Sequence, residues 1–294
     1  MDWKQCEAFL AVIDAGSFEQ AASRLHLTPS AVSQRVRALE GTLGHPLVVR
    51  GRPCRATPVG QQLLQHLRRS RLLEQDFVAE IAGEASAPLS VTLAVNADTL
   101  ATWLLPALAD FLVQQKVLID LVVDDQAHTF ALLEAGLAMA CVSVQAQAMR
   151  GCVAEPLGPM RYRLVASPAC VDRWFKRGFT RAAARRAPVI VFNRKDRLQA
   201  DILLRELGLP DDAYPCHQVP ASEPFLAAIR LGLGYGMVPE LQLGDALARG
   251  ELIDLAPHAP TDVALYWHRW QVQSPRLERL SQTAVAAARQ RFAG

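Results

Sequence analysis

Four polar residues near the N-terminus have the types and spacing of a surface that reads DNA bases. They are Ser30, Ser33, Gln34 and Arg37. Hydroxyl, amide and guanidinium groups hydrogen-bond to base edges or phosphates. Apolar residues recur in the same segment at spacings of four, three and four, namely Val32, Val36, Leu39 and Leu43. These spacings predict one helix whose apolar face is buried and whose polar face enters the major groove.

This helix belongs to a pair that a tight connection joins. Residues 18–25 and 29–40 are both amphipathic, and His26-Leu27-Thr28 separates them, which is the spacing of a helix-turn-helix. The Thr28 hydroxyl can cap the second helix, and proline suits the first helical position, where Pro29 stands. An ordinary helical hairpin with a solvated polar face is the alternative interpretation.

Positive charge is concentrated in the same region, although the whole chain has a net charge of only +2. Residues 24–71 contain nine arginines and a single acid, Glu40, and the planar guanidinium suits contacts with phosphate and guanine. The stretch PLVVRGRPCRATPVG has the pattern of a two-stranded wing. Its arginines are expected at the DNA backbone or minor groove, with a solvated hairpin tip as the alternative. The candidate DNA contacts are Ser17, Thr28, Ser30, Ser33, Gln34, Arg37, Arg50, Arg52 and Arg55.

These elements predict a DNA-binding domain over residues 1–57. A first helix over residues 2–14 completes it, with an apolar face of Trp3, Phe9, Leu10 and Ile13. Thr57-Pro58 then opens a long linker helix over residues 58–82. Its leucines are too irregular for a strict heptad, and we expect them to pack against a second copy of the chain, which would double the DNA site. Residues 83–88 form a hinge.

From residue 89 onward strand and helix patterns alternate. The alternation predicts an α/β effector-binding domain over residues 89–294, with largely parallel sheets. We expect subdomain I over about residues 89–161 and 266–294, subdomain II over about residues 162–265, and a ligand cleft between them. VAEPL and RYRLVAS look like separate strands, and residues 239–249 look like a helix. The whole is an α+β multidomain chain.

Other function classes lack their motifs. The six cysteines are scattered, with no CxxC pair and no histidine couple at metal spacing, so no metal or cofactor is expected. HExxH, GxSxG and GxxxxGK[ST] motifs are missing, and catalysis is not expected. The N-terminus does not have the pattern of a signal peptide, which argues against a secreted solute-binding protein. No apolar run reaches the roughly 18 residues that cross a bilayer, so we expect a cytoplasmic protein without a membrane partner.

Over its whole length the sequence resembles the LysR-type transcriptional regulators. The motifs are AFLAVIDAGSFEQAASRLHLTPSAVSQRVRALEGTLGHPLVVR and TPVGQQLL, followed by the α/β region. The resemblance implies a winged helix-turn-helix, a linker helix that pairs subunits, and an effector domain of periplasmic-binding-protein type. It further implies a homodimer or a dimer of dimers that binds double-stranded DNA and acts on RNA polymerase.

Further runs resemble the arginine- and lysine-responsive subgroup of that family. They are SAVSQRVRALE, PLVVR, LAVNADTLATWLLPAL, PCHQV, GELIDLAP and LYWHRW. This subgroup controls a basic amino-acid exporter and has also been described as an inhibitor of chromosome initiation. AMACVSV departs from the wider family because it lacks the Asp common on that strand. The resemblance implies a basic amino acid as the effector and genes of amino-acid export or metabolism as targets.

In the implied fold, ligands bind where strands end and helix N-termini point into the cleft. The polar candidates at such places are Asn96, Asp98, Thr99, Asp124, Thr129, Ser143, Asn193, Ser222 and Glu223. Backbone amides and the hydroxyl of Thr99 or Ser222 would hold a carboxylate. The acids would hold the α-ammonium and the side-chain cation of a basic amino acid.

Simpler interpretations exist for several of these candidates and for the function. Asp98 and Ser222 can cap helices, Asp124 and Asp125 can be solvated loop charges, and Glu223 can interact only with the helix dipole. A DNA-organising or replication-origin-binding protein would share the N-terminal features and sense nothing. A LysR-type regulator of an unrelated effector is the other alternative, and ligand binding separates the three.

Overall fold

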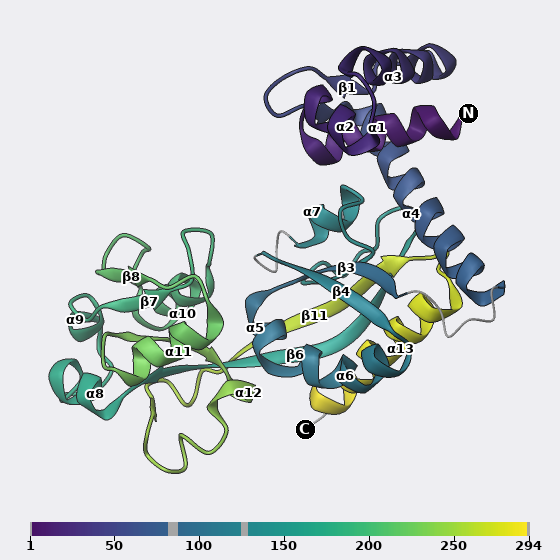
Figure 1. The fold of residues 1–294 in the computed structure, drawn as a ribbon. Coiled ribbons are helices and arrows are strands. Elements are labelled where there is room, and N and C mark those ends of the chain that lie inside the picture. Colours follow the sequence, from purple (N-terminus) through teal and green to yellow (C-terminus); the bar gives the residue numbers. More distant parts are fainter. Residues whose placement is uncertain (1, 82–87, 125–128, 293–294) are drawn as a thin grey trace. The chain divides into compact units, whose positions relative to one another are not determined.

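The computed structural model describes residues 2–81, 88–124 and 129–292 (Figure 1). Most of the hinge expected over residues 83–88 lies outside the described residues, and so does Asp125. The chain divides into two compact units, residues 1–89 with 132–139 and residues 90–131 with 140–294. Each unit has a hydrophobic core of its own.

Three helices form the body of the first unit: α1 (Trp3–Ala15), α2 (Phe18–Leu25) and α3 (Pro29–Leu43). Hydroxyl groups define two of the helix starts. Oγ of Ser17 accepts a hydrogen bond from the N–H of Gln20 at 3.1 Å, and Oγ1 of Thr28 accepts one from the N–H of Ala31 at 3.2 Å. Such caps satisfy backbone donors that have no partner within the helix.

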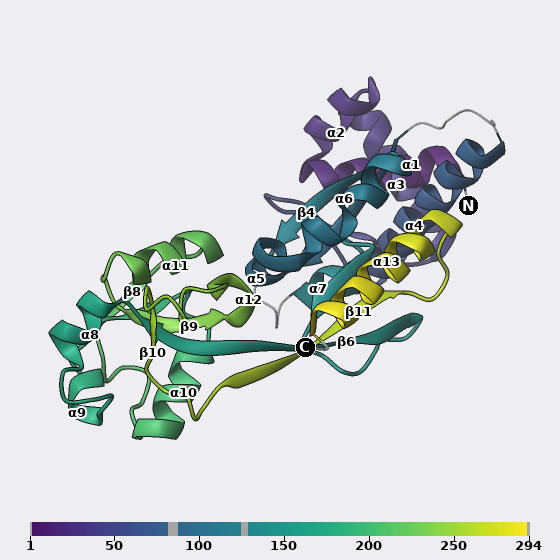
Figure 2. The same ribbon diagram turned by 90° about the horizontal axis from the view of Figure 1, so that it is seen from below.

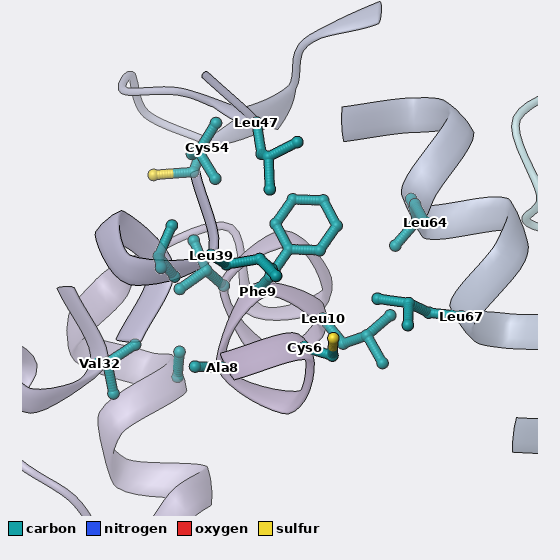
Figure 3. Packing of buried hydrophobic residues seen from close by; sticks show 14 of the residues in the cluster. Cys6, Ala8, Phe9, Leu10, Val32, Leu39, Leu47, Cys54, Leu64 and Leu67 are labelled. Atoms are coloured by element: carbon teal, nitrogen blue, oxygen red, sulfur yellow. The ribbon is translucent and has the colours of Figure 1, made fainter. Parts of the chain in front are cut away.

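The core of this unit joins the helices to the wing and the linker helix. Phe9, Leu39, Leu47, Leu64 and Leu67 meet there, and each is at most 2% exposed (Figure 3). Leu47 directly precedes the wing, and the last two leucines belong to α4 (Pro58–Ile81). The first turns of the linker helix are therefore part of the core of the first unit.

Two residues that we predicted on the apolar faces are exposed instead. Trp3 is 47% exposed and Leu43 is 37% exposed. Trp3 is the first residue of α1 and Leu43 is the last residue of α3. Each lies about one turn beyond the buried residues Cys6 and Leu39, so the packed part of the helix ends before reaching it.

The wing consists of β1 (Val48–Val49) and β2 (Arg55–Ala56), which pair antiparallel. Oε1 of Glu40 accepts hydrogen bonds from the N–H groups of Leu47 at 2.8 Å and Val48 at 3.3 Å. The single acid of the basic region therefore fastens the wing to α3. Linker helix and wing also touch directly, because a Cβ at Gly60 would lie 2.1 Å from the Leu47 carbonyl oxygen.

A nine-stranded mixed sheet is the frame of the second unit. Its strands are β3 (Leu89–Val95), β4 (Val117–Val123), β5 (Ala140–Ser143), β6 (Cys152–Ala166), β7 (Val189–Val191), β8 (Cys216–Gln218), β9 (Tyr235–Pro239), β10 (Ile253–Asp254) and β11 (Thr261–Trp270). The order is β4-β3-β5-β11-β6-β9-β7-β8, and β10 pairs with β6. The long strands β6 and β11 lie side by side and connect two lobes (Figure 1).

Helices cover the sheet in both lobes. Lobe 1 contains β3, β4 and β5. Its helical elements are α5 (Ala97–Thr99), the π-helical turn η1 (Leu100–Leu104), α6 (Leu105–Gln114) and α13 (Pro275–Phe292). Helix α7 (Thr129–Glu134) precedes β5 in the chain. Lobe 2 contains β7, β8 and β9 with α8 (Pro168–Trp174), α9 (Arg181–Ala184), α10 (Leu198–Leu207), α11 (Ser222–Arg230) and α12 (Glu240–Leu243). Ile190, Phe225, Ile229 and Val238 form part of the core of lobe 2.

The second unit differs from the prediction in three respects. VAEPL and RYRLVAS belong to one strand, β6, which continues through Pro156 and Pro159. The register shifts between Leu265 and Tyr266 of β11, which pair with Gly158 and Pro156, so β6 has Leu157 as an extra residue there. The sheet is not largely parallel, since β6 and β11 leave and re-enter lobe 1 in opposite directions. The helix expected over residues 239–249 is reduced to α12, and Gly244 follows it with a positive φ of 48°.

Candidate DNA-contact surface and effector pocket

The polar side of α3 remains in solvent because its apolar side is part of the core. Val32 and Leu39 are fully buried. The exposed residues of the helix include Ser30, Gln34 and Arg37, and Ser33 is half-buried beside them. The Ser17 and Thr28 hydroxyls cap helices, but a hydroxyl that accepts a backbone hydrogen bond still has its own hydrogen to donate to a phosphate.

The three wing arginines have different surroundings. Cζ of Arg50 lies 5.1 Å from the centroid of the Phe18 ring, and its Nη2 lies 3.4 Å from Oγ of Ser33. Arg50 thus packs against α2 and α3, where the aromatic face attracts its charge. Arg52 and Arg55 are exposed on the wing. Exposed guanidinium groups at this position suit the DNA backbone.

A pocket opens in the second unit beside β6, one of the two strands that connect the lobes, and has a volume of about 530 Å³ including its open mouth. Its wall includes three carboxylates, those of Asp98, Asp124 and Asp196, and the aromatic rings of Tyr162 and Phe225. The remaining lining residues are Asn96, Ala97, Phe192, Leu198, Gln199, Ser222, Met237, Pro239 and Gln242. No lysine, arginine or histidine is among these described lining residues.

Asp98 connects the two sides of this pocket. Its Oδ2 accepts a hydrogen bond from the Tyr162 hydroxyl at 2.7 Å, and its Oδ1 accepts one from the Ser222 hydroxyl at 2.5 Å. Asp98 follows β3 in lobe 1, whereas Ser222 opens α11 in lobe 2. The alternative that both residues cap helices is wrong, because Asn96 caps α5 through the N–H of Thr99 and α11 has no side-chain cap.

Tyr162 is held in place by ion pairs on either side of it. Arg161 donates to both carboxylate oxygens of Asp262 at 2.8 Å, which joins β6 to β11 and lowers the pKa of Asp262. Arg163 donates to Glu240 at 3.2 Å. Since neighbouring residues of a strand point to opposite faces, the two arginines anchor β6 on one face while Tyr162 points into the pocket on the other.

A second acceptor group in lobe 2 was missed by our sequence reasoning. Oδ2 of Asp196 accepts hydrogen bonds from Nε2 of Gln199 at 2.6 Å and from the N–H of Phe192 at 3.2 Å. Because Nε2 is the donor, Oε1 of Gln199 is the remaining acceptor, and it is buried without a hydrogen-bond partner among the described residues. The signal that could have revealed Asp196 is the polar run NRKD directly after the strand PVIVF.

The predicted effector contacts fall into two groups. Asn96, Asp98, Asp124 and Ser222 line the pocket. The other predicted residues do not belong to its wall: Thr99, Thr129, Ser143, Asn193 and Glu223.

Each of these five residues has a local role or position of its own. Thr99 is fully buried, and Oγ1 of Thr129 donates to the Val142 carbonyl oxygen at 2.6 Å. Oγ of Ser143 accepts from a backbone N–H at 3.2 Å. Asn193 accepts from the N–H groups of Lys195 and Asp196 at 2.7 and 3.1 Å, so it shapes the turn that presents Asp196. Glu223 is exposed.

Two kinds of feature are not found among the residues that the structure describes. No helix among them is long and apolar enough to cross a bilayer. Within the same residues, no group of three or more His, Cys, Asp or Glu side chains is placed to hold a metal ion.

Comparison with known proteins covers both units. Residues 3–61 match the family described as "Bacterial regulatory helix-turn-helix protein, lysR family", and residues 86–289 match "LysR substrate binding domain". The HTH-type transcriptional regulator ArgP of Aeromonas salmonicida is 43% identical over 290 residues, which cover 98% of this chain and 97% of the relative. The crystal structure of ArgP from Mycobacterium tuberculosis has a TM-score of 0.87 at 42% identity, covering 98% and 97% of the two chains. Full-length LysG from Corynebacterium glutamicum with bound effector Arg has a TM-score of 0.82 at 36% identity, covering 99% of each.

Proposed function

We propose, on the premise that this chain belongs to the LysR family of bacterial regulatory helix-turn-helix proteins, that it controls transcription in response to arginine or lysine. The first unit binds double-stranded DNA, and the pocket of the second unit binds the effector. The pocket binds its ligand and does not transform it. The regulator acts in the cytoplasm, where its DNA lies, on genes of amino-acid export or metabolism.

The observation that carries this proposal is the excess of acceptors in the pocket. Asp98, Asp124 and Asp196 contribute negative charge to the wall, and no lysine, arginine or histidine is among the described residues that line it. A wall of one charge sign attracts ligands of the opposite sign and repels a dicarboxylate. Oε1 of Gln199 adds a buried acceptor that lacks a donor, which is unfavourable until a donor reaches it. A ligand with two separate cationic groups suits this wall.

A basic amino acid has one such group at each end. We assign its α-ammonium to Asp98 and its side-chain cation to Asp196 and Gln199 in lobe 2. The Ser222 hydroxyl and neighbouring backbone N–H groups would bind the carboxylate. The bound effector in the similar LysG structure from Corynebacterium glutamicum is Arg, which supports this choice of ligand.

Effector binding would act on DNA through the lobes. The hydrogen bond between Asp98 and Ser222 spans lobe 1 and lobe 2 at 2.5 Å, so a ligand that takes over these groups favours one lobe arrangement over another. In a homodimer or dimer of dimers, that shift would change the spacing of paired DNA-binding units, the bending of DNA and the contact with RNA polymerase.

On the DNA, we assign base contacts to α3 and backbone contacts to the wing. Gln34 and Arg37 have the reach and donor geometry for base edges, while Arg52 and Arg55 suit phosphates. A single helix of this kind reads only a few base pairs, so a second copy supplies the rest of the site. A DNA-organising protein that senses nothing would use the same surface.

Isothermal titration of the full-length protein at fixed salt tests the effector assignment. The ligands are arginine, lysine, citrulline as the neutral analogue of arginine, and glutamate. Saturable binding of arginine or lysine alone is the expected result. Binding of glutamate without arginine or lysine would overturn the assignment in favour of an unrelated effector. No binding of any of the four would favour the DNA-organising alternative.

A further inference from the structure

A second basic segment lies in lobe 2, outside the pocket and outside the DNA-binding unit. Residues 173–186, RWFKRGFTRAAARR, contain six cations and no acid. All six are exposed: Arg173, Lys176, Arg177, Arg181, Arg185 and Arg186. We call them the α8–α9 basic surface. None of them lines the effector pocket.

Aromatic packing holds this segment in a defined position. The ring centroids of Phe175 and Phe179 are 5.6 Å apart, and they lie 5.2 Å and 6.0 Å from that of Tyr235 on β9. The Tyr235 hydroxyl also donates to the carbonyl oxygen of Ala184 at 3.5 Å. Because the aromatic residues turn inward, the cations between them in the sequence turn outward on a folded scaffold.

Acids neutralise many other arginines of the same unit but leave this surface charged. Arginines of the second unit with an acid partner are Arg161, Arg163, Arg197, Arg205, Arg249 and Arg269. Among the described residues, the cations of the α8–α9 basic surface form no ion pair of this kind. The α8–α9 basic surface therefore keeps its positive charge. Helices α8 and α9 lie together at the end of lobe 2 away from lobe 1 in both views (Figure 1 and Figure 2).

We propose that the α8–α9 basic surface binds the phosphate backbone of duplex DNA, in addition to the contacts made by the first unit. Its cations are mostly arginines, which pair with phosphate through two parallel N–H groups. Gly178, Thr180 and Ala182 between them are small and exposed, so a phosphate backbone can approach closely. A protein partner would call for an apolar centre within the interface, whereas the exposed residues of this segment are charged or small.

Such binding adds affinity without sequence preference. Each phosphate contact releases condensed counterions, so it steepens the fall of affinity with salt by about 0.9 in a plot of log K against log salt concentration. The proposal rests on DNA binding by this chain and is independent of which effector the pocket takes.

The test uses the full-length protein, a random-sequence 60-base-pair duplex and a salt titration followed by fluorescence anisotropy. The variant carries Arg181→Gln, Arg185→Gln and Arg186→Gln together. We expect its slope to be shallower than that of the unmodified protein by about 2–3. The control removes the same charge from three exposed arginines elsewhere, as Arg150→Gln, Arg230→Gln and Arg291→Gln, and should keep the original slope.

Two results would overturn the proposal. The first is an unchanged salt slope in the α8–α9 variant. If transcription with purified RNA polymerase falls while the slope stays the same, the surface serves a protein partner instead of DNA. The second is an equal change in variant and control, which would reflect net charge alone. Thermal melts verify folding, and Lys176→Gln with Arg177→Gln provides a second variant of the same surface.

Discussion

Replacing Asp98 by asparagine would separate its charge from its shape. The carboxylate accepts hydrogen bonds from Tyr162 at 2.7 Å and from Ser222 at 2.5 Å, one on each oxygen. Asparagine is nearly the same size and retains one acceptor, and its amide group can donate to a hydroxyl that turns its own hydrogen away. The Asp98→Asn variant therefore keeps much of the connection between the lobes but loses the negative charge that we assign to the α-ammonium of the effector.

The expected loss follows from that single charged contact. A hydrogen bond to a charged group contributes about 1.5–3 kcal/mol, which corresponds to a dissociation constant about 10- to 150-fold larger. Isothermal titration with arginine and with lysine at fixed salt measures this change in the dissociation constant. Glu223→Gln is the matched control, because Glu223 neighbours Ser222 on α11 yet is exposed and does not line the pocket.

The comparison has a clear negative outcome. If Asp98→Asn binds arginine as tightly as the unmodified protein, Asp98 does not hold the ammonium group. If Glu223→Gln loses as much affinity as Asp98→Asn, the effect comes from the overall field of the lobe and not from contact in the pocket.

Three further predictions concern DNA reading and stability. Gln34→Ala should weaken binding to the cognate site by about 1–3 kcal/mol and relax specificity. Arg52→Ala should weaken binding to all sequences, with a salt slope shallower by about 1. If the two variants lose the same affinity on cognate and on random DNA, this division of roles is wrong. Gly60→Ala should destabilise the chain by about 1–3 kcal/mol in urea unfolding, because its Cβ would meet the Leu47 carbonyl oxygen. Gly41→Ala, with no atom within 4 Å of the new Cβ, should stabilise by up to about 1 kcal/mol. Burial lowers the pKa of His268 below its ordinary value of 6.5. Below that pH the unfolded chain binds a proton that the folded chain does not, so the free energy of unfolding should fall as the pH drops. His268→Gln should reduce this fall in the free energy of unfolding, measured by urea unfolding at several pH values. An unchanged pH dependence in the variant would show that His268 is not its source.

The DNA-binding unit could be predicted in detail because short-range interactions determine it. Thr28 caps a helix through an N–H only three residues away, and Ser17 does the same. The buried spacing of Val32, Val36 and Leu39 follows from the period of one helix. Even here the exposure of Trp3 and Leu43 depended on where neighbouring elements stop, which periodicity does not contain.

The effector pocket was decided mostly by tertiary structure. Sequence patterns located strand ends, and four of the residues found there, including Asp98 and Ser222, line the pocket. The hydrogen bond between these two joins positions 124 residues apart, and the one between Tyr162 and Asp98 joins positions 64 residues apart. The contact of Gln199 with Asp196 is local, three residues apart in the sequence, whereas the burial of Oε1 of Gln199 is a property of the folded chain. Local sequence determines caps, turns and helix faces, because the interacting atoms are a few residues apart. The partners of a polar side chain across a pocket depend on long-range packing, which only the folded chain specifies.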